Sequence, residues 1–230
     1  MSYLLVTLHD SGAVIVTDTL LAREGGKEIA QFGSKTQGVP HLNLAIAFTG
    51  NSGIRDEWLT AVRDRMGSVR DIEELNLFAP AELRKIRDRF EEQWGPAGGQ
   101  RIVHVGYPTD AAKPVMYMYE AADDFEPHRH EAPYTFVQPY PQTFQPWIPG
   151  NIESDVELAT RIRLEGSNRN IIGGELFATS VTNWAQSTHR LHRFPDYEIA
   201  RKIIYLNTVL HNANESPHRT QGRWSAPCDR

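Results

Sequence analysis

The sequence predicts an α+β fold with antiparallel sheets, and three observations carry that prediction. Two short apolar runs, residues 2–8 and 13–17, flank the turn-forming stretch HDSG, a pattern typical of a β-hairpin. Two helical patterns then follow one another, at 53–66 and 81–94. Further strand patterns come after these helices. Runs of strands alternating with pairs of helices favour antiparallel layering over strict βα repeats.

The first half of the chain contains the clearest elements. Residues 20–38 hold four glycines and indicate an irregular connection with short, weak strands, followed by a strand at 42–50. Asn51 or Ser52 is a good cap for the first helix. The second helix is predicted to start after Pro80 and to end at Gly95. Two strands, 101–107 and 114–120, are then joined by a polar turn.

The second half begins with its least regular part, residues 121–153, which are rich in proline and aromatic residues and hold one short strand at Tyr134 to Val137. A helix follows, capped by Ser154, and Gly173-Gly174 leads into a strand at 175–182. A final helix, 196–213, has a broad apolar stripe that includes Ile199, Ile203, Ile204, Leu206 and Leu210. We expect one domain over 1–213 and a polar tail over 214–230.

Composition excludes several classes of protein. Lys and Arg number 24 against 29 Asp and Glu, and a net charge of −5 offers no broad basic surface for nucleic acid. The single cysteine, Cys228, can form no internal disulfide, which fits a reducing compartment. No export signal is visible, and no segment approaches the roughly 20 apolar residues that span a bilayer. We therefore expect a cytoplasmic protein without membrane or nucleic-acid partners.

Several histidines are candidates for a functional role. His128 and His130, with Glu131, resemble a metal cluster, but prolines on both sides indicate a solvated loop without a complementary ligand set. His189 and His192 flank arginines in what is predicted to be an exposed loop, and His104 is interpreted as a satisfied sheet residue. Phosphate-binding glycine loops and paired-cysteine zinc motifs are absent from the sequence. We predict no metal and no cofactor.

The opening residues carry a resemblance. The pattern S-x-L-L-V-T-x-x-x-S-G-A-V-I-V-T-D-T is similar to the start of proteasome β-type subunits in the N-terminal-nucleophile hydrolase superfamily. Asp18, Lys35 and the AFTGNSG turn with Gly50 match that family in order and approximate spacing, and the run from Ile172 to Phe177 resembles its G-G strand entry. The resemblance implies a four-layer α-β-β-α sandwich, peptide or amide hydrolysis, and assembly into a homo-oligomeric ring or related form.

Simple chemistry makes sense of these residue types. Removal of Met1 by methionine aminopeptidase would place a hydroxyl and a free α-amine on Ser2. An amine with a pKa of about 8 can take the hydroxyl proton directly or through water. Lys35 supplies a positive charge that Asp18 holds in place. The backbone N–H of Gly50 would stabilise an oxyanion. The predicted catalytic residues are therefore Ser2, Asp18, Lys35 and Gly50.

Each of these residues also has an ordinary interpretation. Ser2 is a common second residue, Asp18 and Gly50 can simply end strands, and Lys35 can be a solvated loop charge. The family usually begins with Thr and carries an Asp and a Ser before its G-G strand, where this chain has the run from Asn168 to Ile172. The alternative is a noncatalytic subunit or binding protein of the same fold. In either case the Pro-rich segment 132–153 is a candidate for contacts between subunits.

Overall fold

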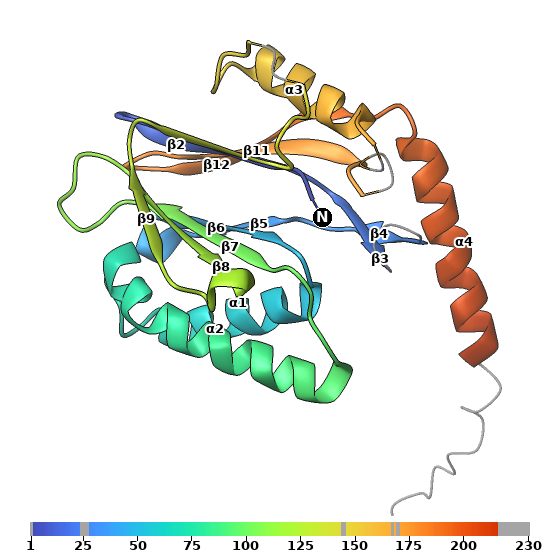
Figure 1. The fold of residues 1–230 in the computed structure, drawn as a ribbon, viewed down its shortest axis with the longest axis horizontal. Helices are drawn as coiled ribbons and strands as arrows, with labels where there is room; N and C mark the ends of the chain where they lie inside the picture. The colour runs from blue at the N-terminus through green and yellow to red at the C-terminus, as the bar shows by residue number, and fades with distance from the viewer. Residues whose placement is uncertain (1, 24–27, 144–145, 167, 169–170, 216–230) are drawn as a thin grey trace, which may run out of the picture.

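The computed structural model describes residues 2–23, 28–143, 146–166, 168 and 171–215. Two five-stranded antiparallel sheets dominate it (Figure 1). The first sheet has the order β10 (Tyr134–Gln138), β1 (Leu4–His9), β2 (Gly12–Asp18), β11 (Glu175–Val181) and β12 (Gln186–Arg193). The second has the order β5 (Thr36–Val39), β6 (Leu44–Thr49), β7 (Arg101–Gly106), β8 (Val115–Glu120) and β9 (His128–Glu131). A two-stranded ribbon, β3 (Leu20–Arg23) and β4 (Glu28–Phe32), lies apart from both.

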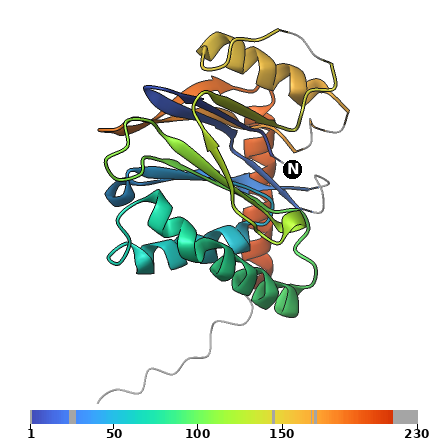
Figure 2. The same ribbon diagram turned by 60° about the vertical axis from the view of Figure 1, so that its left-hand side comes forward.

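Alternation along β1 explains how the layers pack. Leu4 and Val6 point toward the second sheet, where they join a buried cluster with residues of β6 and β7. Tyr3 and Leu5 point the other way, into a cluster beneath α3 (Ile152–Leu164). Helices α1 (Ser52–Arg65) and α2 (Ile72–Trp94) cover the outer face of the second sheet, as both views show (Figures 1 and 2). The predicted mixture of helices and antiparallel sheets is confirmed.

The N-terminal half follows the sequence closely except in α2. The hairpin is β1 with β2, and Asn51 caps α1 by accepting a hydrogen bond from the N–H of Gly53. The predicted start of α2 after Pro80 is wrong, because the helix begins nine residues earlier and holds Pro80 inside it. Asp71 caps this earlier start by accepting from the N–H groups of two glutamates. Burial of Ile72, Leu75 and Ala79 offsets the donor that Pro80 lacks.

Two segments predicted as loops are strands. His128–Glu131 forms β9, which pairs with β8, and the segment from His189 to His192 belongs to β12, which pairs with β11. The neighbouring strand supplies the backbone partners in both cases, and that information is absent from a local pattern. The short strand predicted at Tyr134 is confirmed as β10. Helix α3 is capped by Asn151 rather than by the predicted Ser154, whose N–H donates to the Asn151 side chain.

The last helix, α4 (Tyr197–Glu215), is confirmed, but its apolar stripe is not covered. The helix leans on β4, where Tyr197 stacks on Phe32 with ring centroids 4.9 Å apart. Leu206 and Leu210, farther along, are 56% and 61% exposed. The tail predicted from residue 214 lies, beyond Glu215, outside the described residues. Within the described ranges, no helix is both long enough and apolar enough to cross a bilayer.

A buried histidine lies at the centre of the second sheet's outer core. His104 on β7 is fully buried, and its Nε2 atom accepts a hydrogen bond of 3.1 Å from the indole of Trp58 on α1. The two rings also stack. Burial lowers the pKa of His104 to about 3, so the ring is neutral in the folded protein.

This burial predicts a pH-dependent stability. An unfolded histidine titrates near 6.5, so His104 contributes fully above that pH, and its contribution is lost as the pH falls toward 3. We expect His104 to reduce the free energy of unfolding by about 2 kcal/mol between pH 7 and pH 5. Urea unfolding at both pH values measures this, with His104→Gln as the comparison. An equal pH dependence of the free energy of unfolding in His104→Gln would contradict the lowered pKa of His104.

Candidate active site

Ser2 and Tyr3 enter the first sheet just before β1. Ser2 is 8% exposed, and Tyr3 is fully buried beneath α3. The backbone N–H of Tyr3 donates a hydrogen bond of 3.0 Å to Oδ1 of Asp18. Because Leu4 is paired with Thr17, this contact continues the β1–β2 ladder by one step through a side chain. The position of Ser2 is therefore tied to the carboxylate of Asp18.

Asp18 is the last residue of β2 and is completely buried. Its Oδ1 atom accepts from the Tyr3 N–H and from Nζ of Lys35. Its Oδ2 atom accepts from the N–H of Leu20 at 3.2 Å and from that of Gly173 at 3.0 Å. A buried carboxylate requires such partners, because the loss of hydration is otherwise unbalanced. Four donors from four chain segments thus fix this side chain.

Lys35 lies just before β5 and is 2% exposed. Its carbonyl accepts from the N–H of Phe48 at 2.9 Å, which extends the pairing of β5 with β6. Its ammonium forms an ion pair of 2.6 Å with Asp18. Burial lowers the pKa of Lys35; the charge of Asp18 opposes this, and that of Arg55 adds to it. Lys35 is therefore a buried ammonium held in one position and not a solvated loop charge.

Gly50 lies between β6 and α1, two residues beyond Phe48. Its backbone has a φ of +113°, which side chains rarely tolerate. A Cβ there would also lie 2.5 Å from Oε1 of Gln100 and 2.6 Å from the carbonyl of Gly99. The same Gln100 oxygen accepts from the N–H of Asn51, so the turn is built closely around the glycine. Both the backbone and the space require glycine at this position.

The structure thus brings Asp18 and Lys35 into contact and places Ser2 one residue from the Asp18 hydrogen bond. Gly50 lies at the end of β6, the strand that pairs with Lys35.

Sequence reasoning missed two residues that contribute to the site. Gly173 was noted only as a strand entry, although its N–H holds Asp18. Arg55 on α1 donates to the carbonyl of Ser34 and adds positive charge near Lys35. The only feature of the sequence that could have indicated Arg55 is its position in the first turn of α1.

A cavity of about 300 Å³ adjoins this site between the two sheets. The hydroxyls of Thr17 and Thr36, the neighbours of Asp18 and Lys35, lie 3.3 Å apart at its wall. Phe177 and Phe32 add apolar surface, and Glu175 lies at its edge, paired with two arginines. The cavity is thus lined mainly by hydroxyl and aromatic groups.

The sequence before β11 differs from what the resemblance implies. Asn168 donates from its side chain to the carbonyl of Ile162 at the end of α3, so it serves that helix. Residues 169 and 170 lie outside the described residues. Ile171 and Ile172 are buried and apolar. In the described part of this stretch, no acid or hydroxyl side chain accompanies the N-terminal residue.

No group of three or more metal-ligating side chains exists among the described residues. His128 is hydrogen-bonded to Asp123 at 2.6 Å, and Arg129 forms ion pairs with Glu73 and Glu131, so these side chains on β9 are engaged in separate surface contacts. His189 and His192 lie on β12. These histidines form no ligand set with one another in the described chain.

Comparison with known proteins identifies the fold. No protein family model and no curated protein sequence matches the chain. Solved structures of Anbu do. Anbu (ancestral beta-subunit) from Yersinia bercovieri is 11% identical, with a TM-score of 0.60 over 95% of this chain and 100% of that one. Anbu from Hyphomicrobium sp. strain MC1 is 13% identical, with a TM-score of 0.57 over 96% and 100%, and its Gly-1 mutant is 14% identical, with a TM-score of 0.58 over the same shares. The chain has a proteasome-like fold similar to that of Anbu.

The buried ion pair yields a stability prediction. Lys35→Met leaves the Asp18 carboxylate buried without its cation, and we expect a loss of about 3–5 kcal/mol in the free energy of unfolding. The double variant Asp18→Asn/Lys35→Met removes both charges and should lose less than the sum of the single variants. Chemical denaturation measures all three.

Lys113→Met is the matched control, because Lys113 pairs with Asp10 on the surface, where both side chains are more than half exposed. Its effect should stay below about 1 kcal/mol. A similarly small effect of Lys35→Met would show that the ammonium is not held as described.

Proposed function

We propose that the chain is a proteasome-like N-terminal-nucleophile amidohydrolase or peptidase that uses Ser2 after removal of Met1. The observation that carries the proposal is the buried Lys35–Asp18 pair of 2.6 Å, whose carboxylate also binds the N–H of the residue after Ser2. The same carboxylate therefore orders both the Lys35 ammonium and the backbone next to Ser2. We assign the fold to a four-layer α-β-β-α sandwich and residues 1–213 to one domain.

The proposed reaction has two halves. The α-amine of Ser2 accepts the hydroxyl proton while Oγ bonds to the substrate's carbonyl carbon, and the N–H of Gly50 donates to the resulting oxyanion. Collapse breaks the C–N bond, and the leaving amine takes the proton, which leaves an acyl ester on Ser2. Water then attacks this ester, gives its proton to the α-amine, and releases a carboxylic acid as Oγ regains a proton.

Lys35 acts in this scheme through its charge and its fixed position. A buried ammonium stabilises negative charge that develops on Oγ during proton transfer, and its effect is larger in a dry site than in water. Asp18 keeps the ammonium in place. The substrate is a peptide or small amide, and the adjoining cavity of about 300 Å³ offers space for a side chain of such a molecule.

A noncatalytic subunit of the same fold is the second candidate. It is favoured by the described part of the stretch before β11, where the Asn168 side chain bonds to the end of α3 and Ile171 and Ile172 are apolar. An N-terminal amine without nearby polar support would be a weaker base. In that case the Asp18–Lys35 pair would have only a structural role.

The nucleophile is tested with Ser2→Ala. Intact mass of the purified protein first establishes whether Met1 is removed. Labelling by a β-lactone or epoxyketone is then followed by mass spectrometry, and amide hydrolysis is measured on a small peptide panel. We expect both to be abolished in Ser2→Ala, because no other hydroxyl shares a residue with the α-amine.

Ser11→Ala is the matched control, since Ser11 lies exposed in the β1–β2 turn. It should keep the labelling and the activity of the parent chain. Retention of Met1, or unchanged labelling of Ser2→Ala, would eliminate the catalytic proposal and leave the noncatalytic subunit.

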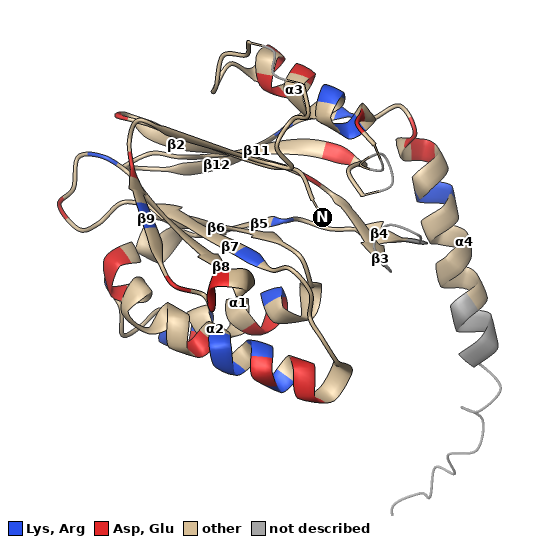
Figure 3. Cartoon of the chain, viewed as in Figure 1, with Lys and Arg blue, Asp and Glu red and all other residues tan. Residues whose placement is uncertain are grey.

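We also propose a homo-oligomer in which α4 provides an interface. Its residues 203–210 carry no charge, and Figure 3 shows this part of the helix free of acidic and basic residues, unlike the outer turns of α2. Ile199, Ile203, Leu206 and Leu210 recur at helical spacing and are 38–64% exposed. Such a stripe on a projecting helix is typical of a surface that is covered by a partner.

Charge on this stripe should weaken the assembly. We expect Leu206→Glu/Leu210→Glu to reduce the mass measured by size exclusion with light scattering, because two carboxylates would have to be buried at the interface. Leu77→Glu is the control, as Leu77 lies on α2 and is 82% exposed. Equal masses for the parent chain and both variants would show that α4 is not part of the interface.

A further inference from the structure

The β11–β12 hairpin displays one tryptophan on an ordered tip. Trp184 is 90% exposed. The turn that holds it is closed by the N–H of Thr182, which donates to the carbonyl of Ala185 at 2.9 Å. The Thr182 hydroxyl also accepts from the N–H groups of Trp184 and Ala185, at 3.4 and 3.1 Å. The backbone of the tip is thus fixed, while its largest side chain has almost no contact with the protein.

The tip is also fastened to the opposite sheet. The side chain of Asn43 donates to the carbonyl of Asn183 at 3.1 Å, and the side chain of Gln186 donates to the carbonyl of Leu44 at 2.9 Å. These two contacts hold the hairpin across the end of the sandwich. An exposed aromatic side chain on a fixed backbone has only two torsion angles to order on binding, and such residues are typical anchors at interfaces.

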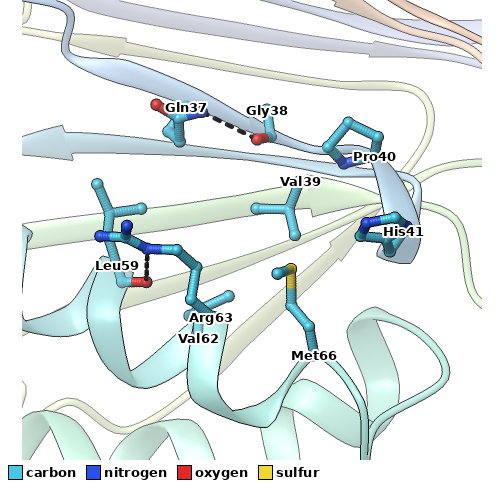
Figure 4. A pocket seen from close by; sticks show the side chains of 9 residues that line it. All are labelled: Gln37, Gly38, Val39, Pro40, His41, Leu59, Val62, Arg63 and Met66. Atoms are coloured by element: carbon cyan, nitrogen blue, oxygen red, sulfur yellow. Dashed lines mark hydrogen bonds between the residues drawn. The ribbon is translucent and has the colours of Figure 1, made fainter.

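An apolar groove lies beside this tip. It has a volume of about 350 Å³ and runs between β5, the turn at Pro40–Leu42 and the end of α1. Figure 4 shows Val39 and Val62 inside it, with Leu59 and Met66 along the α1 side and Arg63 at its edge. Val39 and Val62 are buried, at 5% and 1% exposure, so the floor is apolar.

The groove and the tip belong to one end of the molecule. Gly38, which lines the groove, approaches the hairpin so closely that a Cβ on it would lie 2.5 Å from Oε1 of Gln186. Asn43, which holds the tip, directly follows the Pro40–Leu42 turn. A projecting side chain and a recess of matching chemistry therefore lie at the same end of the molecule, beside the edge strand β5.

We propose that this end of the molecule is a self-complementary interface, in which Trp184 of each of two copies enters the groove of the other. A two-fold contact requires that a projection and its recess lie on the same face, because residue i then meets residue j twice. The groove suits an indole: its floor is apolar, and the Arg63 guanidinium at the edge can lie over the ring face. A second copy of the chain is the partner that supplies both a tryptophan for the groove and a groove for the tryptophan.

The size of the contact indicates its strength. A tryptophan buries about 150–250 Å². Two tryptophans and the two grooves that receive them bury roughly 600–1,000 Å² in total, less than the ~1,200 Å² at which standard interfaces begin. The contact is therefore weak in isolation and depends on protein concentration. It gains effect when another interface already holds the chains together.

The other interface lies at the far end of the same hairpin. β12 has eight residues, so its tip and the start of α4 are separated by roughly 26 Å. Figure 1 shows α4 at one end of the sheets, away from the tip. Two different self-contacts on one chain join copies in alternation, which gives either a closed ring or an open filament. This inference rests on the proposed self-association but not on the chemistry of Ser2.

Sedimentation velocity over a range of concentrations tests it. We expect the parent chain to form species larger than a dimer, and Trp184→Ala to stop at a dimer held by α4, with the dissociation constant of the lost contact raised about tenfold or more. Met66→Glu and the milder surface change Arg63→Glu should act in the same direction from the groove side. Trp94→Ala is the matched control, since Trp94 is 69% exposed at the end of α2.

Combination with α4 separates the two interfaces. Leu206→Glu should form a dimer only at high concentration, because the Trp184 contact alone is weak, and Trp184→Ala/Leu206→Glu should be a monomer at every concentration. An effect of Trp184→Ala without one of Leu206→Glu refutes the role of α4 but keeps the Trp184 contact. Unchanged assembly of Trp184→Ala at every concentration overturns the inference. An effect of Trp184→Ala that neither groove variant reproduces overturns it too, because the tryptophan would then bind another surface or another protein.

Discussion

The carboxylate of Asp18 is the point on which the arrangement of the site depends. It is fully buried and accepts from the N–H of Leu20, two residues on, and from three donors far from it in the chain, namely Lys35 and the N–H groups of Tyr3 and Gly173. A buried charge is tolerated only with such partners. The start of β1, the exit from β2, the approach to β5 and the entry to β11 must therefore all be in place together, which couples the ordering of the N-terminus to the closing of both sheets.

Part of this arrangement could be predicted from sequence. The β1–β2 hairpin and α1 follow local rules, because alternation and capping by Asn51 act within a few residues. Asp18 at a strand end and Lys35 in a glycine-rich stretch were selected by order and spacing, and the fold brings them into contact. The requirement for glycine at Gly50 comes from its positive φ and from the close approach of Gly99 and Gln100, which are distant in the chain, and is visible only in three dimensions.

The errors have a common physical origin. Pro80 normally marks a helix boundary, but α2 passes through it because buried side chains on its inner face outweigh one lost hydrogen bond. The segment of β9 was interpreted as a loop because prolines flank it, and that of β12 because its histidines and arginines are polar, whereas strand formation there depends on pairing with β8 and β11. The sequence likewise gave no indication that the stripe on α4 would be left uncovered, since amphipathicity does not identify the partner that covers the apolar face.

The energetics of the ion pair bear on the choice between a catalytic and a structural chain. Burying Lys35 and Asp18 removes two charges from water, and well-packed apolar residues in such positions are often equally or more stabilising. The contribution to stability therefore does not explain why an ammonium is buried beside the first strand. The positioning of the N-terminal residues does explain it, because one carboxylate orders both this cation and the residue after Ser2. The interfaces proposed at α4 and at Trp184 involve neither charge, so in a chain that served only in assembly the pair would have only the structural role of holding these segments together.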